Sequence, residues 1–250
     1  MNLSQLKEAV CVANLELVKF GLVTLTWGNA GELTEDGDAF VVKPSGIPYE
    51  QLTPDDMVLV GLDGRVREGK NRPSSDTPTY VVLFRYFRSV APQIRGIVHT
   101  HSLCATSWAQ SRREIPCLGT THADQFYGSV PLTRPLTRQE VESAYETNTG
   151  NVIVEYFQQS RRQPVEVPAV LVAGHAPFTW GKTAHDAVKN AVSLEAIAQM
   201  ARDSYLIHPS VPPLEDYVLE KHYSRKHGAN AYYGQENVSN NLQKQENTKP

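Results

Sequence analysis

Three histidines stand near the ends of two apolar segments of the chain. His99 and His101 are separated by one residue and follow an apolar pair. In a strand, side chains two residues apart point to the same face and lie roughly 6.5–7 Å apart along the chain, so both imidazoles could reach one ion. His175 ends a second apolar run, residues 170–175. Three imidazoles with one open position form the ligand set of a catalytic zinc site, in which a substrate oxygen is polarised. The alternative is that all three are ordinary core or surface histidines.

A short segment before an expected helix supplies a carboxylate and two hydroxyls. Residues 73–78 read Pro-Ser-Ser-Asp-Thr-Pro. Asp76 is a fourth candidate for the metal site, but a carboxylate here is equally typical of a helix N-cap, and the local pattern leaves both roles open. Ser74 and Ser75 precede the helix N-terminus, where backbone N–H groups and the helix dipole favour phosphate. A second turn, residues 43–46, places a lysine among small residues. Each turn is common by itself, but together they would suit one phosphate group.

The elements that must position these residues alternate between helices and strands. Apolar residues at helical spacing predict helices over 3–18, 78–90, 137–147 and 183–204. Apolar or β-branched runs predict strands over 22–27, 39–42, 57–62, 65–68, 97–101, 152–157 and 169–173. Thr137 is a candidate N-cap three residues before Glu140. The fingerprints of dinucleotide-binding and P-loop proteins are absent from the sequence, so we expect an α/β fold that does not bind nucleotides.

Composition excludes several classes of protein. The chain has 250 residues and a formal net charge of -3, so we expect no general attraction to nucleic acid or to an anionic membrane. No apolar run approaches the roughly 20 residues that span a bilayer, and the N-terminus does not resemble a signal peptide. Cys11, Cys104 and Cys117 lack paired spacing and are interpreted as reduced thiols of a cytoplasmic protein. Residues 236–250 are polar and free of aromatic side chains, which predicts a disordered tail.

A set of short motifs, considered together, resembles the class II aldolase/adducin family, and within it the pentulose-phosphate 4-epimerases. The resemblance runs in register from about Leu3 to Gln235, and it is specific in combination, although His-x-His alone would not be. The motifs are Trp27-Gly28-Asn29, Lys43-Pro44-Ser45-Gly46, Pro73-Ser74-Ser75-Asp76-Thr77-Pro78, His99-Thr100-His101, Thr121-His122-Ala123-Asp124, Gly150-Asn151-Val152-Ile153-Val154-Glu155, Lys221-His222-Tyr223, Lys226-His227-Gly228 and Ala231-Tyr232-Tyr233-Gly234-Gln235.

The resemblance assigns expected roles residue by residue. It implies a divalent metal, Zn²⁺ with Mn²⁺ or Co²⁺ as alternatives, held by His99, His101 and His175 with Asp76 beside it. It implies an acid/base pair, Asp124 and Tyr233, supplied by a neighbouring subunit. Phosphate-binding and supporting positions are expected at Asn29, Lys43, Ser45, Gly46, Ser74, Ser75, Thr120, Glu146, His222 and Arg225.

The resemblance also implies a fold, an assembly and a reaction. The expected fold is an α/β three-layer sandwich with a central, mostly antiparallel sheet flanked by helices, formed by one catalytic domain over residues 1–235. The expected assembly is a C4 homotetramer with sites at subunit interfaces. The expected reaction inverts C4 of L-ribulose 5-phosphate to give D-xylulose 5-phosphate, by retro-aldol cleavage of the C3–C4 bond and re-addition.

Some positions depart from the family pattern, and two other functions compete. The family usually has a serine at Gly31, relatives often have a histidine at Tyr80, and residues 173–176 replace a more polar run. These changes bear on substrate preference rather than on the metal. The first competing function is a class II aldolase acting on a deoxyhexulose 1-phosphate. Aldolases of that type tend to have glutamate at the position of Asp76 and a different C-terminal segment, so Asp76 and residues 221–235 disfavour this function. The second is a non-catalytic, adducin-like binding module, which the intact set of metal-ligand candidates disfavours.

Overall fold

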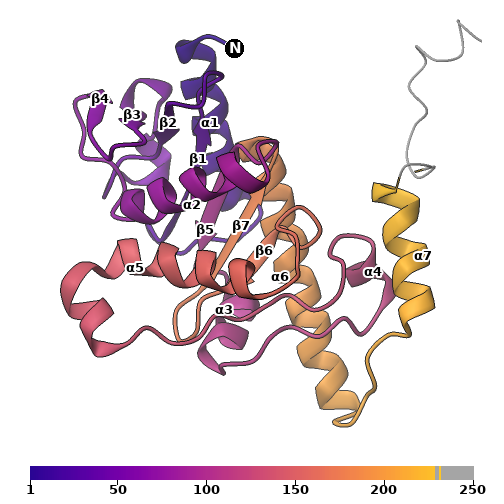
Figure 1. Ribbon diagram of the computed structural model, residues 1–250. Helices are drawn as coiled ribbons and strands as arrows, with labels where there is room; N and C mark the ends of the chain where they lie inside the picture. Colours follow the sequence, from indigo (N-terminus) through magenta and orange to yellow (C-terminus); the bar gives the residue numbers. More distant parts are fainter. Residues whose placement is uncertain (229–230, 232–250) are drawn as a thin grey trace, which may run out of the picture.

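The computed structural model describes residues 1–228 and 231; Tyr233 and the expected tail, 236–250, lie outside the described residues. One seven-stranded sheet runs through the molecule, with the strand order β4-β3-β2-β1-β5-β7-β6 and antiparallel pairing throughout (Figure 1). The strands are β1 (Gly28–Leu33), β2 (Ala39–Val42), β3 (Val58–Gly61), β4 (Val66–Glu68), β5 (Gly96–Thr100), β6 (Ala169–Leu171) and β7 (Pro177–Gly181). The α-helices are α1 (Leu3–Lys19), α2 (Thr77–Val90), α3 (Leu103–Gln110), α4 (Thr120–Ala123), α5 (Arg138–Gln159), α6 (Ala184–Ile207) and α7 (Asp216–His227).

Helices cover both faces of the sheet, so the expected three-layer sandwich is confirmed. Alternate residues of a strand point to opposite faces, and β5 shows this directly. Ile97 packs in the core cluster formed with α2 and α5, whereas Val98 packs in the cluster formed with α1 and α6. Figure 1 shows α2 and α5 in front of the sheet and α6 behind it. His99 is two residues from Ile97 in the same strand, so its side chain points to the face that α2 and α5 cover.

Local sequence signals fix the beginnings of several helices. In α1, Asn2 and Gln5 form a capping box in which each side chain bonds the other residue's backbone N–H. The predicted cap of the fifth helix is confirmed, because Thr137 and Glu140 form the same motif at the start of α5. Within the described part of the chain, every helix is too short or too polar to span a bilayer.

The predicted strand over residues 152–157 is wrong, because this segment belongs to α5. Its β-branched and aromatic residues favour a strand locally. In the structure, however, Val152, Ile153 and Phe157 share the buried side of a helix. Packing of Ile153 and Phe157 in the core shared with α2 overrides the local preference. The predicted helix over 137–147 is the first part of the same element.

The predicted strand over residues 22–27 is also wrong, because the first strand begins at Gly28. Leu22 is buried, but Leu25 is 75% exposed and adopts a φ of 54°. The segment is therefore a turn rather than a strand paired in the sheet. Gly28 has a φ of 116°, which favours glycine, and the chain enters β1 there. Strand β7 and helices α3, α4 and α7 were not predicted from the sequence.

Candidate active site

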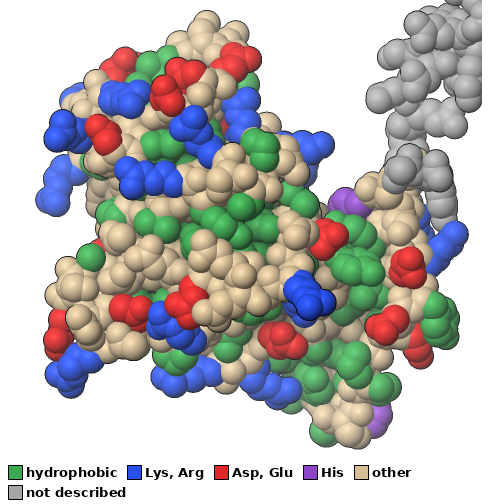
Figure 2. Space-filling model, viewed as in Figure 1, with side chains coloured by type: hydrophobic (Ala, Val, Ile, Leu, Met, Phe, Trp, Pro, Cys, Tyr) green, Lys and Arg blue, Asp and Glu red, His purple; other side chains and the backbone are tan. Residues whose placement is uncertain are grey.

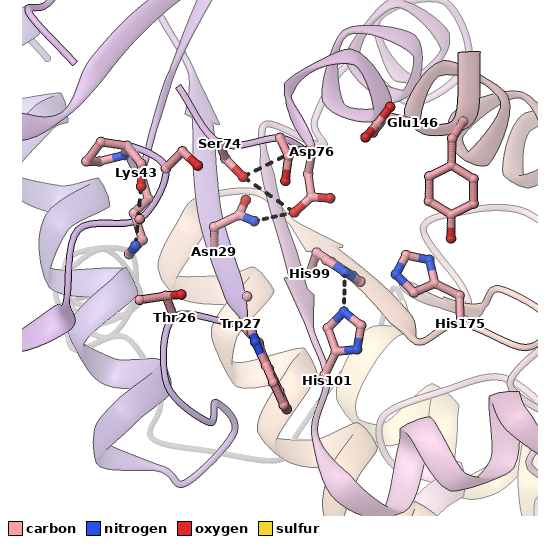
Figure 3. A pocket seen from close by; sticks show the side chains of 16 residues that line it. Thr26, Trp27, Asn29, Lys43, Ser74, Asp76, His99, His101, Glu146 and His175 are labelled. Atoms are coloured by element: carbon pink, nitrogen blue, oxygen red, sulfur yellow. Dashed lines mark hydrogen bonds between the residues drawn. The ribbon is translucent and has the colours of Figure 1, made fainter. Parts of the chain in front are cut away.

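A cavity of about 310 Å³ opens where β1, β5 and the turns after β2 and β6 come together, a volume typical of small-molecule sites. We call it the histidine pocket. Figure 3 shows the histidines at one end, Lys43 and Ser74 toward the other, and Asn29 with Asp76 between them. It is lined by Thr26, Trp27, Gly28, Asn29, Lys43, Pro44, Ser45, Gly46, Ser74, Ser75, Asp76, His99, His101, Tyr145, Glu146 and His175.

The three predicted histidines converge at one end of this pocket. Their candidate ligand atoms all lie within 4.8 Å of one another. His99 belongs to β5, His101 follows that strand directly, and His175 lies in the turn between β6 and β7. The Nε2 atoms of His99 and His101 are 3.2 Å apart. The histidines therefore form a group that could hold a metal ion.

Surrounding residues hold the ring of His99 in place. Its Nδ1 lies 2.9 Å from the carbonyl oxygen of Pro177, to which it donates a hydrogen bond, so Nε2 presents a lone pair to the other histidines. The ring stacks on Phe178 at a centroid distance of 4.2 Å. A backbone carbonyl that fixes the second nitrogen of a histidine is a usual companion of metal ligation.

The electrostatics of the group keep two of its members neutral. Burial, with the neighbouring His99, lowers the pKa of His101 to about 4, against the opposing charge of Asp76. Burial, with His99 and His101, lowers the pKa of His175 to about 3. Metal ligation requires neutral imidazole, so at neutral pH neither residue needs to lose a proton first.

The residues present fit a divalent ion. The Nδ1 atom of His175 is buried and has no hydrogen-bond partner, which costs free energy unless a bound group satisfies it. Two nitrogens on a tetrahedral zinc ion stand about 3.3 Å apart, given Zn–N distances near 2.0–2.1 Å, and the His99 and His101 nitrogens are 3.2 Å apart. Imidazole nitrogen suits zinc and several other first-row metals.

Asp76 faces the pocket and its side chain does not cap α2, which argues against the N-cap role; its place beside a metal stays a prediction. It occupies the N-cap position, but its side chain makes no cap hydrogen bond. Instead its Oδ2 accepts a hydrogen bond of 2.6 Å from Nδ2 of Asn29 and one of 3.4 Å from Ser74 (Figure 3). Asn29 is 2% exposed, and its Oδ1 is buried without a partner. A ligand hydroxyl that donates to this atom would satisfy it.

The two turns predicted to bind one phosphate, residues 43–46 and 73–78, are held together by backbone contacts. Pro44 and Pro73 form an isolated antiparallel bridge, and the N–H of Ser74 donates to the carbonyl of Lys43. Burial lowers the pKa of Lys43, whose Nζ donates to the carbonyl of Ile47 at 2.9 Å. Ser45, Gly46, Ser74 and Ser75 line the histidine pocket with Lys43. The structure therefore brings together both segments that sequence analysis paired for one phosphate.

A kink in α5 places Glu146, and also Tyr145, which was not predicted, in the lining of the pocket. Ala144 has φ -159° and ψ 75°, which is not helical, and the two pocket residues follow it directly. The hydroxyl of Thr79 donates to the carbonyl of Glu146 at 2.6 Å and fixes the chain there. The ring of Tyr145 lies 6.0 Å from that of His175. No local pattern marks the kink, so sequence analysis missed Tyr145.

Asp124 lies outside the lining of the histidine pocket in this chain. Its carboxylate accepts from Nε and Nη2 of Arg225 at 3.0 and 2.6 Å and lies 3.0 Å from Nδ1 of His222. Nζ of Lys226 is 3.7 Å away. We call these four residues the Asp124 cluster. Thr120 begins α4, and its carbonyl accepts from the N–H of Asp124.

Arg225 and Lys226, together with a hydrogen bond from His222, keep the Asp124 carboxyl ionised. Partial burial raises the pKa of its carboxyl, but hydrogen bonds from Arg225 and His222 and the charge of Lys226 outweigh burial, so the net shift is downward. At neutral pH the group can accept a proton rather than donate one. The structure thus joins Asp124, His222, Arg225 and Thr120 to one another but not to the histidines, and Tyr233 lies outside the described residues.

Comparisons with known proteins agree with this architecture. The chain is 49% identical over 233 residues to the L-ribulose-5-phosphate 4-epimerases UlaF of Salmonella paratyphi B and Salmonella typhi, covering 93% of this chain and all of each relative. Among solved structures, an L-fuculose 1-phosphate aldolase matches with a TM-score of 0.72 at 21% identity, covering 88% of this chain and 95% of that one. The corresponding Thermus thermophilus aldolase matches with a TM-score of 0.64 at 24% identity, covering 84% and 99%. The structural matches show a shared fold.

The family follows from sequence as well as from fold. Residues 8–202 match the family described as Class II Aldolase and Adducin N-terminal domain. This stretch contains all the described residues that line the histidine pocket. The chain belongs to the class II aldolase and adducin family.

Proposed function

We propose that this protein is a metal-dependent isomerase that interconverts L-ribulose 5-phosphate and D-xylulose 5-phosphate by inversion at C4. The observation that carries the proposal is the histidine pocket itself, in which a candidate metal group and a candidate phosphate turn flank Asn29 and Asp76. Relatives at 49% identity over their whole length are named L-ribulose-5-phosphate 4-epimerases, which supports this substrate. The catalytic unit that we propose spans residues 1–235.

The chemistry of the substrate requires a carbon–carbon cleavage. C4 is β to the C2 carbonyl, so its hydrogen is not acidic and direct proton abstraction fails. In the retro-aldol route, a base takes the proton of the C4 hydroxyl and the C3–C4 bond breaks. The electron pair of that bond passes into the C2 carbonyl, giving an enediolate and glycolaldehyde phosphate. The aldehyde turns, C3 attacks its other face, and an acid protonates the new C4 oxyanion.

The two ends of the histidine pocket match the two fragments. His99, His101 and His175 would hold the divalent ion, which we propose to be zinc, with manganese or cobalt as substitutes. When bound, the ion supplies a Lewis acid that stabilises the negative charge of the three-carbon fragment. Lys43 and the serine turns would bind the phosphate. Retention of that phosphate keeps re-addition effectively intramolecular.

The acid/base groups are proposed to come from a neighbouring subunit of a C4 tetramer. Asp124 would serve one face of the aldehyde as the ionised base, with His222, Arg225 and Thr120 as its supports, and Tyr233 would serve the other face. Exposed apolar side chains support a subunit contact near these residues. Leu206 and Ile207, at the end of α6, are 76% and 86% exposed. Figure 2 shows hydrophobic side chains gathered on this face around α4, α7 and the end of α6.

Product analysis tests the reaction. Protein loaded with zinc should convert L-ribulose 5-phosphate to D-xylulose 5-phosphate, and the chelated protein should not. Accumulation of free glycolaldehyde phosphate and dihydroxyacetone without the epimer would identify an aldolase instead. Absence of both reactions from protein with stoichiometric metal would refute the proposed function.

Complementation between inactive chains tests the shared site. A Tyr233→Phe chain lacks the proposed phenol, and a His99→Asn chain lacks a proposed metal ligand. Hybrid oligomers of the two would contain some interfaces with both groups intact, so activity should return when the chains are refolded together. Verified hybrids without activity would exclude a site shared between subunits.

The proposed compartment of the protein is the cytoplasm. Cys11, Cys104 and Cys117 are buried and form no disulfide, which supports a reducing compartment.

A further inference from the structure

The side chain of Tyr80, in α2, packs on the sheet and contacts the strand that carries Asn29. The side chain of Tyr80 is fully buried, and its hydroxyl donates a hydrogen bond of 3.0 Å to the backbone carbonyl of Asn29. Asn29 faces His99 across the β1 and β5 pair. The hydroxyl therefore lies where the strand bearing Asn29 meets the strand bearing the first histidine of the pocket.

The phenol remains a hydrogen-bond donor under all working conditions. Burial first, and the nearby Asp76 carboxylate second, raise the pKa of Tyr80 well above 10, against a smaller opposing effect of the His99 backbone. A buried hydroxyl without an acceptor costs free energy, so the Asn29 carbonyl is the partner that fixes the orientation of the ring.

Gly31 supplies the space that this ring occupies. Asn29, Gly31 and Leu33 share one face of β1, and Leu33 lies in the core cluster that contains Tyr80. A Cβ at Gly31 would lie 3.0 Å from Cε2 of Tyr80 and 2.9 Å from the carbonyl oxygen of Val41. Both distances are shorter than ordinary carbon contacts of about 3.5–4.0 Å. A side chain at this position would push the ring away from Asn29.

The contact extends to polar atoms of the histidine pocket. Nδ2 of Asn29 donates to Oδ2 of Asp76 at 2.6 Å, which leaves Oδ1 of Asn29 buried without a partner. Both residues line the pocket between the histidines and Lys43. Displacement of the backbone at Asn29 would move the free oxygen and the Asp76 contact together.

We propose that Tyr80 is a positioning residue of the active site, that it fixes the Asn29 carboxamide for a substrate hydroxyl, and that Gly31 is required to make room for it. The kinetic part of this proposal rests on the proposed epimerase function. The geometric part does not, because the Asn29 contact with Asp76 exists whatever the substrate is. The ring of His99 is fixed independently by Pro177 and Phe178, so metal binding should not depend on Tyr80.

Tyr80→Phe is the decisive variant, since it keeps the ring and removes only the hydroxyl. The expected result is unchanged zinc affinity with a roughly 10–100-fold lower kcat/KM, because small displacements of a positioning group cost rates of this order. In its crystal structure the 2.6 Å contact between Asn29 and Asp76 should lengthen or break. Gly31→Ala should have the same effects. The double variant should be no worse than the worse single variant, because both changes act on one contact.

Thr179→Val is the matched control. It removes a buried hydroxyl that donates 2.9 Å to the carbonyl of Ala187, away from the pocket, and should lower thermal stability without changing kcat/KM. Wild-type kcat/KM and an intact contact between Asn29 and Asp76 in Tyr80→Phe would overturn the proposal, whether or not stability falls. If Gly31→Ala does not fold, Tyr80→Phe decides alone. If the wild-type protein lacks epimerase activity, the proposed function fails and the crystal structures still decide the role of Tyr80.

Discussion

Replacement of Asp124 with asparagine separates its structural role from its proposed catalytic role. The side chain is 15% exposed and makes two hydrogen bonds to Arg225, of 3.0 and 2.6 Å, besides the contact with His222. Asparagine removes the negative charge and can turn an N–H group toward the guanidinium. Loss of hydrogen bonds between charged groups costs about 1.5–3 kcal/mol. Partial exposure places the expected loss near the lower end, about 2 kcal/mol.

The loss should be concentrated in α7, which has no buried residue. Besides the Asp124 cluster, the ring of Tyr223 contacts Tyr127 at 5.0 Å, and Nε2 of His227 lies 3.0 Å from the carbonyl oxygen of Asp124. Hydrogen exchange of residues 216–227 should therefore quicken in Asp124→Asn. If α7 unfolds together with the core, the midpoint of thermal unfolding should fall by roughly 4–8 °C, since 1 kcal/mol shifts a chain of this size by about 2–4 °C.

Kinetics provide the second measurement. A base that takes the proton of the C4 hydroxyl contributes about 10²–10⁴-fold, so kcat of Asp124→Asn should fall by that factor at saturating metal. Asp38→Asn is the matched control, because Asp38 is 62% exposed and makes one ion pair of 3.4 Å with Arg88. This control should change stability by less than about 0.5 kcal/mol and leave kcat unchanged.

The pH dependence of the free energy of unfolding tests whether the ionised form of Asp124 stabilises the protein. The folded-state pKa of Asp124 is below its ordinary value of about 3.9. Its stabilisation is therefore present above that value and is lost as pH falls through the folded pKa. Wild-type and Asp124→Asn stabilities should converge below about pH 4. Unchanged exchange in α7 would refute the structural reasoning, and near-normal kcat in a folded, metal-loaded variant would refute the base role.

Three further predictions concern the phosphate turn, the metal and the C-terminus. Lys43→Met should raise KM for the sugar phosphate by about 10-fold or more with a smaller effect on kcat, because a buried cation is lost; Lys189→Met, at a side chain 62% exposed, is the control. Chelation should abolish activity, and zinc, manganese or cobalt should restore it; full activity of metal-free protein would exclude a metal-dependent reaction. Truncation after Gln235 should leave turnover unchanged, whereas Tyr233→Phe should lower kcat with KM nearly kept, and a fully active Tyr233→Phe would remove this phenol from the mechanism.

Helices α1, α2 and α6 and the first part of α5 were readable from the sequence. Capping and periodicity act within about one turn of helix, so Thr137 and Glu140 could be paired without knowledge of the fold. The parity of His99 and His101 was readable for the same reason, since a strand repeats every two residues. In the structure, their Nε2 atoms lie 3.2 Å apart, which also depends on the orientation of the two rings.

Strand β1 and the second half of α5 could not be assigned from local signals. The sequence of β1 is Gly-Asn-Ala-Gly-Glu-Leu, which strand propensity disfavours. At Gly31 the close approach of Tyr80 leaves little room for a side chain. In α5 the opposite conflict arises, because β-branched residues at 152–154 form a helix whose apolar side packs on α2. Packing free energy exceeded the propensity difference in both places.

The sequence by itself determined the chemistry that is available: three imidazoles, a carboxylate beside two serines, and a lysine in a small-residue turn. Only the tertiary structure decided which of these groups meet. The bridge between Pro44 and Pro73 joins the two anion turns, and the kink at Ala144 brings Tyr145 to the pocket. It also decided that Asp124 lies with α7 and apart from the histidines. Such contacts join residues far apart in the chain, and their free energy comes from burial of whole helix and strand faces, which no local pattern encodes.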